Sequence, residues 1–232
     1  MQLDVRGVAA MLNVRESTIY RWIHEKKMPA RGIGGRYRFG RAELLEWCTA
    51  HKVNVSPDIF AEESDNDENM LLADALGRGG IFYDVPGTDK NSALRSVVDR
   101  LPLPEGCQAD LILQLFLARE AMGSTSVGGG VAIPHPRHPV VLRVAEPSLS
   151  LCFLSAPIDF GARDGELVHT LFVLLSPSVQ IHLQMLARIA CLLADGRFAQ
   201  VLAARASRDE VLADVRRVEA TFNSRAAVGS EH

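Results

Sequence analysis

The residue types and spacing of Arg119, His135 and His182 are suited to phosphoryl chemistry. His135 stands between Pro134 and Pro136, so two backbone donors are absent around it, and helix is disfavoured for the residue before each proline. We therefore expect this imidazole at a rigid, extended strand end. A neutral imidazole placed there can act as a nucleophile, and the forked guanidinium of Arg119 is suited to holding phosphoryl oxygens.

The loop before His135 offers further donors. Ser124 and Thr125 carry hydroxyl groups, and three consecutive glycines at 128–130 give a flexible backbone. Phosphoryl transfer requires positioning and charge neutralisation from a protein more than covalent work. We therefore take Ser124 and Thr125 as candidate phosphate-loop residues beside the predicted catalytic set.

Other interpretations of the histidines stay open. His135 is alternatively a structural residue at a strand end, and His182 a helix cap. A zinc site of His135, His138 and His182 is a further alternative, but the spacing is not that of a helical ligand pair and no carboxylate accompanies it. We predict no metal site and no cofactor. His169 begins a buried strand and is interpreted as a core or edge group.

Helix and strand patterns alternate from residue 69 onward and must position these side chains. The pattern predicts an α/β fold, more closely an α+β-like mixed sheet covered by helices. Residues 171–175 are apolar on both faces, as a central strand would be. The expected helices are 69–77, 92–101, 109–122, 181–194, which we expect to end at Asp195-Gly196, and 207–222; the expected strands are 80–85, 131–133, 149–154 and 167–175.

Composition indicates a globular protein. The chain has 232 residues, of which 47% are hydrophobic, and this suffices for sizeable cores. No apolar run reaches the ~18 residues of a membrane helix, and the N-terminus lacks the apolar stretch of a secretory signal. We expect a cytoplasmic protein without membrane insertion. Its four cysteines form no CxxC pair, which argues against a disulfide framework or a cysteine metal site.

Charge divides the chain into two parts. Residues 1–52 hold ten Lys or Arg against five Asp or Glu, whereas the remaining residues hold 15 against 23. A basic end favours a polyanionic partner. The acidic, polar stretch that follows reads as a solvated linker. We predict a domain at 1–52, a linker at 53–68, a second domain at 69–224 and a disordered tail at 225–232.

The basic unit shows helical periodicity over residues 3–24, interrupted once, which predicts two short helices joined by a tight turn. Two strands around a Gly34-Gly35 turn and a third helix over 41–51 follow. Trp22 and Trp47 fall on the apolar face, so we expect them in the core. The donors that would face phosphates and base edges are Arg15, Ser17, Thr18, Tyr20, Arg21, Arg31, Arg36 and Arg38.

The segment VRGVAAMLNVRESTIYRWIHEKKMPARGIGGRYRFGRAELLEWC resembles the excisionase or MerR-type winged helix-turn-helix family, over residues 3–50. Gly7 stands where family members typically carry an acidic residue. The resemblance implies a recognition helix in the major groove of double-stranded DNA and a wing along its backbone. Because one module gives modest affinity, we expect a homodimer on a paired site. The alternative is that this basic unit binds a protein partner or nothing.

The segments LAREAMGSTSVGGGVAIPH and PIDFGARDGELVHTLFVLLSPSVQIHLQMLARIACLL resemble the EIIA type-2 domain of the bacterial sugar phosphotransferase system, the fructose, mannitol and nitrogen-regulatory family, over about residues 70–222. The resemblance implies that His135 accepts a phosphoryl group from the histidine-containing phosphocarrier protein. It also implies that Arg119 and His182 assist. Pro136 departs from the family pattern, in which a small residue commonly follows the active histidine.

Taken together, the two units predict a DNA-binding regulator whose EIIA-like domain senses phosphotransferase flux through phosphorylation of His135. If active, that domain is a phosphohistidine carrier. One alternative is a phosphoryl-relay EIIA subunit that passes phosphate to a separate sugar transporter. The other is a regulatory binding module that is not phosphorylated.

Overall fold

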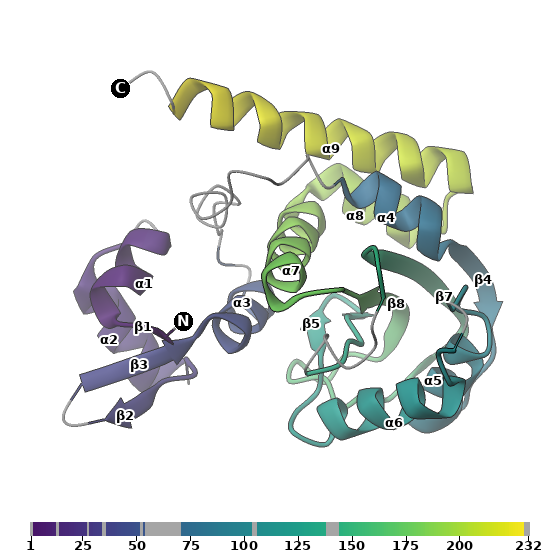
Figure 1. Cartoon of the computed structure of the whole chain (residues 1–232), viewed down its shortest axis with the longest axis horizontal. Helices are drawn as coiled ribbons and strands as arrows, with labels where there is room; N and C mark the ends of the chain where they lie inside the picture. The colour runs from purple at the N-terminus through teal and green to yellow at the C-terminus, as the bar shows by residue number, and fades with distance from the viewer. Residues whose placement is uncertain are drawn as a thin grey trace.

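The structure is a computed structural model and describes residues 2–12, 14–26, 28–33, 36–51, 53, 71–103, 106–137 and 144–229 (Figure 1). Its N-terminal unit combines three helices with a small antiparallel sheet of order β1-β3-β2. The elements of this unit are β1 (Gln2–Leu3), α1 (Val5–Met11), α2 (Glu16–Glu25), β2 (Arg31–Ile33), β3 (Arg36–Gly40) and α3 (Arg41–Ala50).

The N-terminal unit has its own apolar core. Asp4 caps α1 by accepting a hydrogen bond from the Gly7 backbone, and Ile19 of α2 is fully buried. Trp22 and Trp47 pack with their ring centroids 5.5 Å apart, so both belong to this core, as expected. The helices and the hairpin were predicted; the pairing of β1 with β3 was not. The predicted Gly34-Gly35 turn lies outside the described residues.

The C-terminal unit is built on a five-stranded mixed sheet of order β4-β7-β8-β6-β5. Strands β4 and β7 are parallel, β7 and β8 antiparallel, β6 and β8 parallel, and β5 and β6 antiparallel. Its elements are α4 (Leu72–Gly79), β4 (Ile81–Val85), α5 (Lys90–Val98), α6 (Ala109–Glu120), β5 (Ser126–Gly128), β6 (Val131–Ala132), β7 (Ser148–Ile158), β8 (Val168–Leu175), α7 (Val179–Ala194), α8 (Gly196–Ala203) and α9 (Arg208–Gly229).

Strand β8 is central and apolar on both faces, as predicted. Phe172 and Leu174 face the core that α4, α7, α8 and α9 cover, whereas Leu171 and Val173 face the core that α5 and α6 cover. Figure 1 shows these two helical layers on opposite sides of the sheet. The α/β expectation of a mixed sheet covered by helices is confirmed.

Three details differ from the sequence expectations. Strand β5 was not expected. Asp195 does end α7, but its side chain accepts a hydrogen bond from the Phe198 backbone at 2.9 Å, so Gly196 starts α8 instead of a loop. Helix α9 runs to Gly229, into the predicted tail. The predicted linker falls almost entirely on residues 54–70, outside the described residues. None of the described helices is both long and apolar enough to cross a membrane.

Candidate phosphoacceptor site

The sheet places His135 at the end of a strand. The segment between β6 and His135 keeps backbone hydrogen bonds to both neighbouring segments. Ile133 N–H donates to the Thr125 carbonyl at 3.1 Å, and Leu174 N–H donates to the Pro134 carbonyl at 3.1 Å. The His135 side chain is buried, with an exposed fraction of 2%. Hydrogen bonds therefore fix the backbone that carries the imidazole.

One hydrogen bond determines the tautomer of His135. Its Nδ1 lies 2.7 Å from the Ile133 carbonyl oxygen. A carbonyl oxygen can only accept, so Nδ1 carries a proton, and in the neutral imidazole Nε2 holds the lone pair. In this tautomer Nε2 is the nucleophilic nitrogen of the ring.

His182 lies in α7, the helix that follows the neighbouring parallel strand β8. Chain β8 ends at Leu175, Ser176 follows, and Ser178 caps α7, in which His182 lies one turn from the start. Its Nδ1 is 3.4 Å from the Ser176 hydroxyl, and its exposed fraction is 3%. Because β6 and β8 are parallel, their carboxyl ends meet at one edge of the sheet.

The two histidines therefore form a pair. Their ring centroids are 4.9 Å apart with an interplanar angle of 52°. The chain separates His135 from His182 by a whole hairpin, so this pairing is a product of the sheet topology. It brings together two of the three residues that the sequence singles out.

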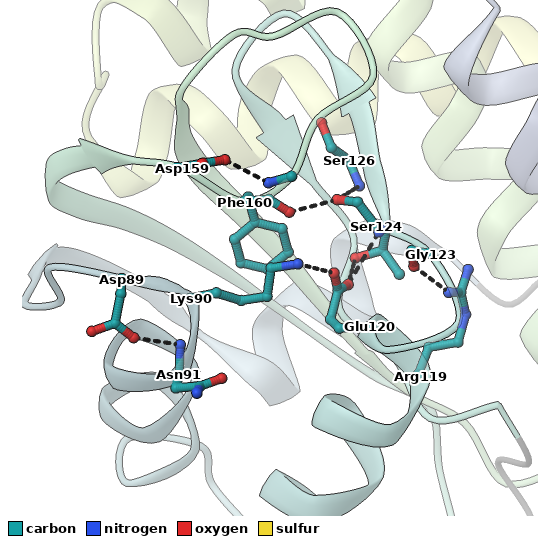
Figure 2. A network of polar contacts seen from close by, with 12 residues as sticks. Asp89, Lys90, Asn91, Arg119, Glu120, Gly123, Ser124, Ser126, Asp159 and Phe160 are labelled. Atoms are coloured by element: carbon teal, nitrogen blue, oxygen red, sulfur yellow. Dashed lines mark hydrogen bonds and ion pairs between the residues drawn. The ribbon is translucent and has the colours of Figure 1, made fainter.

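Arg119 lies in the last turn of α6 and is largely buried, with an exposed fraction of 9%. Its Nη1 donates to the Gly123 carbonyl at 2.8 Å (Figure 2). The guanidinium thereby holds the turn that opens the loop toward β5. Its contact with a phosphoryl group stays a prediction.

The two candidate phosphate-loop residues take part in fixing that loop. Thr125 donates both its backbone N–H, at 3.1 Å, and its hydroxyl to Glu120. The Ser124 hydroxyl donates to the Phe160 carbonyl at 2.8 Å (Figure 2). A direct contact of these donors with a phosphoryl group would require that they leave these partners, so their predicted role stays a prediction.

Glu120 and Lys90 were missed by the sequence analysis. Glu120 is 7% exposed and also pairs with Lys90 Nζ at 3.1 Å, and Lys90 lies over the Phe160 ring (Figure 2). A buried carboxylate is tolerated when it is paired and hydrogen-bonded. The only signal in the sequence was that Glu120 directly follows Arg119, and nothing in the sequence pointed to Lys90.

The turn between β5 and β6 requires glycine for steric reasons. Gly129 and Gly130 have φ of 62° and 71°, and a Cβ on Gly130 would lie 2.4 Å from the His169 ring. His169 is half-buried, and its Nδ1 is 2.8 Å from the Thr170 hydroxyl. Burial lowers the pKa of His169, which favours its neutral form. His169 thus occupies a core or edge position, as interpreted from the sequence.

The predicted DNA-binding residues lie on α2 and the β2–β3 hairpin. Arg15, Ser17, Tyr20, Arg21, Arg31 and Arg36 are exposed, and Thr18 and Arg38 are partly exposed. Tyr20 makes an edge contact with Tyr37 of β3, at 6.0 Å between ring centroids, which ties the hairpin to α2. Arg31 pairs with Glu43 of α3 at 3.2 Å. The predicted DNA-binding residues thus give the N-terminal unit several hydrogen-bond donors and cations at its surface.

Arg137 is a third residue that the sequence analysis did not single out. It follows His135 by two positions, contacts the Met122 sulfur at 3.1 Å, and lies 4.0 Å from Glu43 of the N-terminal unit. His138 lies outside the described residues. Within the described part of the chain, no group of three or more His, Cys, Asp or Glu could hold a metal ion.

Comparison with known proteins adds independent findings. A family model described as phosphoenolpyruvate-dependent sugar phosphotransferase system, EIIA 2, matches residues 76–217, and a helix-turn-helix domain model matches residues 3–52. A nitrogen regulatory protein of Pseudomonas aeruginosa is 38% identical over 128 residues, covering 53% of this chain and 80% of that protein.

Two further matches extend this picture. The crystal structure of the nitrogen regulatory protein IIA-Ntr from Neisseria meningitidis has a TM-score of 0.52 at 28% identity, covering 58% of this chain and 92% of that one. The transcriptional repressor DcmR of Methylorubrum extorquens is 27% identical over 84 residues, covering 35% of this chain and 32% of that protein. The first EIIA match alone spans more than half of the residues, so the chain belongs to the EIIA 2 family of the phosphoenolpyruvate-dependent sugar phosphotransferase system, with a helix-turn-helix domain preceding its EIIA domain.

Proposed function

We propose that this protein is a DNA-binding regulator whose EIIA domain accepts a phosphoryl group on Nε2 of His135 from the histidine-containing phosphocarrier protein. The observation that carries the proposal is the bond between His135 Nδ1 and the Ile133 carbonyl, because it leaves Nε2 as the nucleophile. Membership of the EIIA 2 family supports the same chemistry.

The transfer balances without a proton leaving His135. The Nε2 lone pair forms a new N–P bond while the N–P bond of the donor phosphohistidine breaks, and that bond's electron pair returns to the donor imidazole. The proton stays on Nδ1 throughout, in its hydrogen bond to the Ile133 carbonyl oxygen. The Ile133 carbonyl also stabilises the positive charge that the ring gains as the new bond forms.

The phosphoryl oxygens then need cations and donors. Pro136 has no backbone N–H, so the residue after His135 cannot supply one. The His182 ring centroid is 4.9 Å from that of His135, and this proximity supports a role for His182 as a hydrogen-bond donor to the phosphoryl group. Arg119, held to the Gly123 carbonyl, is the cation carried over from the family pattern. We assign both residues to the stabilisation of the phosphoryl group.

The N-terminal unit supplies the regulatory half of the proposal. Its helix-turn-helix match and the exposed Arg15, Arg21 and Arg36 on α2 and the hairpin support contact with duplex DNA. The similarity to a protein that is itself a transcriptional repressor points in the same direction. A dimer would place two such units on a paired site.

A labelling experiment tests the phosphorylation. The full chain is incubated with labelled phosphoenolpyruvate, enzyme I and the phosphocarrier protein, and acid-labile label is measured on it. We expect label on the wild type and on His24→Ala, an exposed histidine of α2, and no label on His135→Ala.

Other results would redirect the proposal. An unlabelled wild type would leave the regulatory binding module as the function. Label that moves on to a separate transporter domain, with no duplex binding by the chain, would favour the relay subunit.

A further inference from the structure

Helix α3 of the N-terminal unit packs on α7 of the EIIA domain. Leu183 and Ala187 of α7 belong to the same apolar cluster as Leu44 and Leu45 of α3, and are not part of the two clusters that flank the sheet. Figure 1 shows α3 lying beside α7 and β5. Ala187 is fully buried, so its burial depends on the docked N-terminal unit.

This contact involves chain neighbours of both histidines. Leu183 directly follows His182 on α7. Arg137 follows His135 by two positions, and its Nη2 lies 4.0 Å from Glu43 Oε1 on α3. The docked helix therefore touches a near neighbour of each histidine, and among the described side chains in these contacts Glu43 is the acidic one.

The contact between the two units is incompletely packed. A cavity of about 190 Å³ remains between the units, lined among others by Cys48 and Val53 on one side and by Ala190 and Cys191 on the other. Incomplete packing forfeits dispersion energy at the junction. The Glu43–Arg137 pair is 41% and 45% exposed, and exposed ion pairs contribute little. A change of charge nearby can therefore shift the balance.

We propose that the α3–α7 contact is a latch that phosphorylation of His135 opens, an inference that rests on the function proposed above. A phosphoryl group adds up to about two negative charges two residues from Arg137. Arg137 is attracted toward the phosphoryl oxygens, whereas Glu43, which also pairs with Arg31 at 3.2 Å, is repelled by them. Charge repulsion across the contact therefore replaces the weak attraction between Glu43 and Arg137. The N-terminal unit then separates from α7.

Linkage makes the coupling reciprocal. If phosphorylation weakens docking, docking disfavours phosphorylation by the same factor. His135 and His182 are only 2% and 3% exposed, so a protein donor needs the surrounding surface to open before it reaches them. By the same linkage, the undocked state accepts the phosphoryl group more readily and the phosphoryl group favours the undocked state.

A charge-only comparison tests the latch without any phosphoryl donor. His135→Asp and His135→Asn have nearly the same size and differ by one negative charge. Docking is followed by iodoacetamide labelling of Cys48 and Cys191, which line the cavity, with Cys152 in the EIIA core as internal control. Burial raises the pKa of the Cys48 thiol to about 12, so it reacts slowly while docked.

We expect Cys48 and Cys191 to react about 5- to 10-fold faster in the Asp variant than in the Asn variant, a typical size for coupling between sites. Adding Glu43→Gln to the Asp variant should remove most of the difference, because the repelled charge is gone. Equal rates in the Asp and Asn variants would overturn the latch. Because this comparison uses no donor, its failure is distinct from an unlabelled wild type.

A second pair of variants guards against misfolding at His135. Ala187→Glu places a charge in the α3–α7 contact, and Ala187→Ser is the matched small control. We expect Ala187→Glu to react quickly at Cys48 and to carry about 5- to 10-fold more phosphohistidine than the serine variant at limiting donor. Equal Cys48 labelling in the two variants and in phosphorylated and unphosphorylated wild type would also overturn the latch.

Discussion

The two units of this chain carry their functional groups in opposite ways. Arg21 and Arg36 of the N-terminal unit are exposed, whereas His135 and His182 of the EIIA domain are 2% and 3% exposed and fixed by bonds to backbone and side chain. Contact with a polyanion works through solvated cations. A phosphoryl acceptor needs one nitrogen with a lone pair in a fixed place, and a sheet edge supplies that.

The largest expected effect concerns the buried histidine pair of the EIIA domain. We expect His182→Ala to slow phosphorylation of His135 by about 100- to 1000-fold, the usual cost of removing one preorganised donor from a transition state. Rapid-quench measurement of label transfer from the phosphocarrier protein checks this, with circular dichroism to confirm the fold. A rate within twofold of wild type would mean that His182 has only a structural role.

The duplex affinity of the N-terminal unit should depend on salt concentration through its exposed arginines. Replacing Arg21, Arg36 and Arg38 together with Gln should lower duplex affinity by about 100-fold and reduce the slope of log K against log salt by about 3. Fluorescence anisotropy from 50 to 300 mM salt measures both quantities. The exposed arginines Arg100, Arg163 and Arg216 of the EIIA domain form a matched control triple. An unchanged slope would remove these residues from the DNA contact.

Two neighbouring glycines sharpen the comparison within the EIIA domain. Gly130→Ala should lower the free energy of unfolding by about 2–4 kcal/mol, because the new Cβ meets the His169 ring at 2.4 Å and φ is positive. Gly129→Ala, also at positive φ but with no atom within 4 Å of its Cβ, should lose only about 1 kcal/mol. Urea unfolding measures both, and equal losses would contradict the steric explanation.

The smallest expected effect is a pH slope at His169. Burial lowers the pKa of the His169 imidazole below 6.5, so the unfolded chain binds this proton more readily. The free energy of unfolding should therefore fall as pH drops below about 6.5 and level off below the folded pKa. His169→Gln should flatten that slope, as measured by urea midpoints between pH 8 and 5. Parallel profiles for the two proteins would contradict the assignment.

Most long elements of the fold could be predicted from periodicity, because a helix or strand that buries one face repeats its apolar residues at a fixed spacing. Short elements could not. Strand β5 is three residues long and carries too little pattern, and α8 was hidden because Asp195 can end one helix and cap the next. A local sequence does not distinguish these two uses of a capping aspartate.

The site was predictable only where its signal lies in neighbouring residues of the sequence. Two prolines mark His135 by their backbone chemistry alone. The Lys90–Glu120 pair and the Glu43–Arg137 pair join residues at least thirty positions apart, so no spacing rule points to them. Only the packing of α5 against α6 and of α3 against α7 brings their charges together.

What the sequence alone determined is therefore chemical and local: a basic helical unit, an α/β unit, and a histidine held in extended backbone by its neighbours. The tertiary structure decided that Nδ1 of His135 bonds to the Ile133 carbonyl and that the His182 ring stands beside it. It also decided that α3 contacts neighbours of both histidines. The reason is physical: periodicity and proline act over a few residues, whereas hydrogen bonds, charge pairs and apolar clusters act through space.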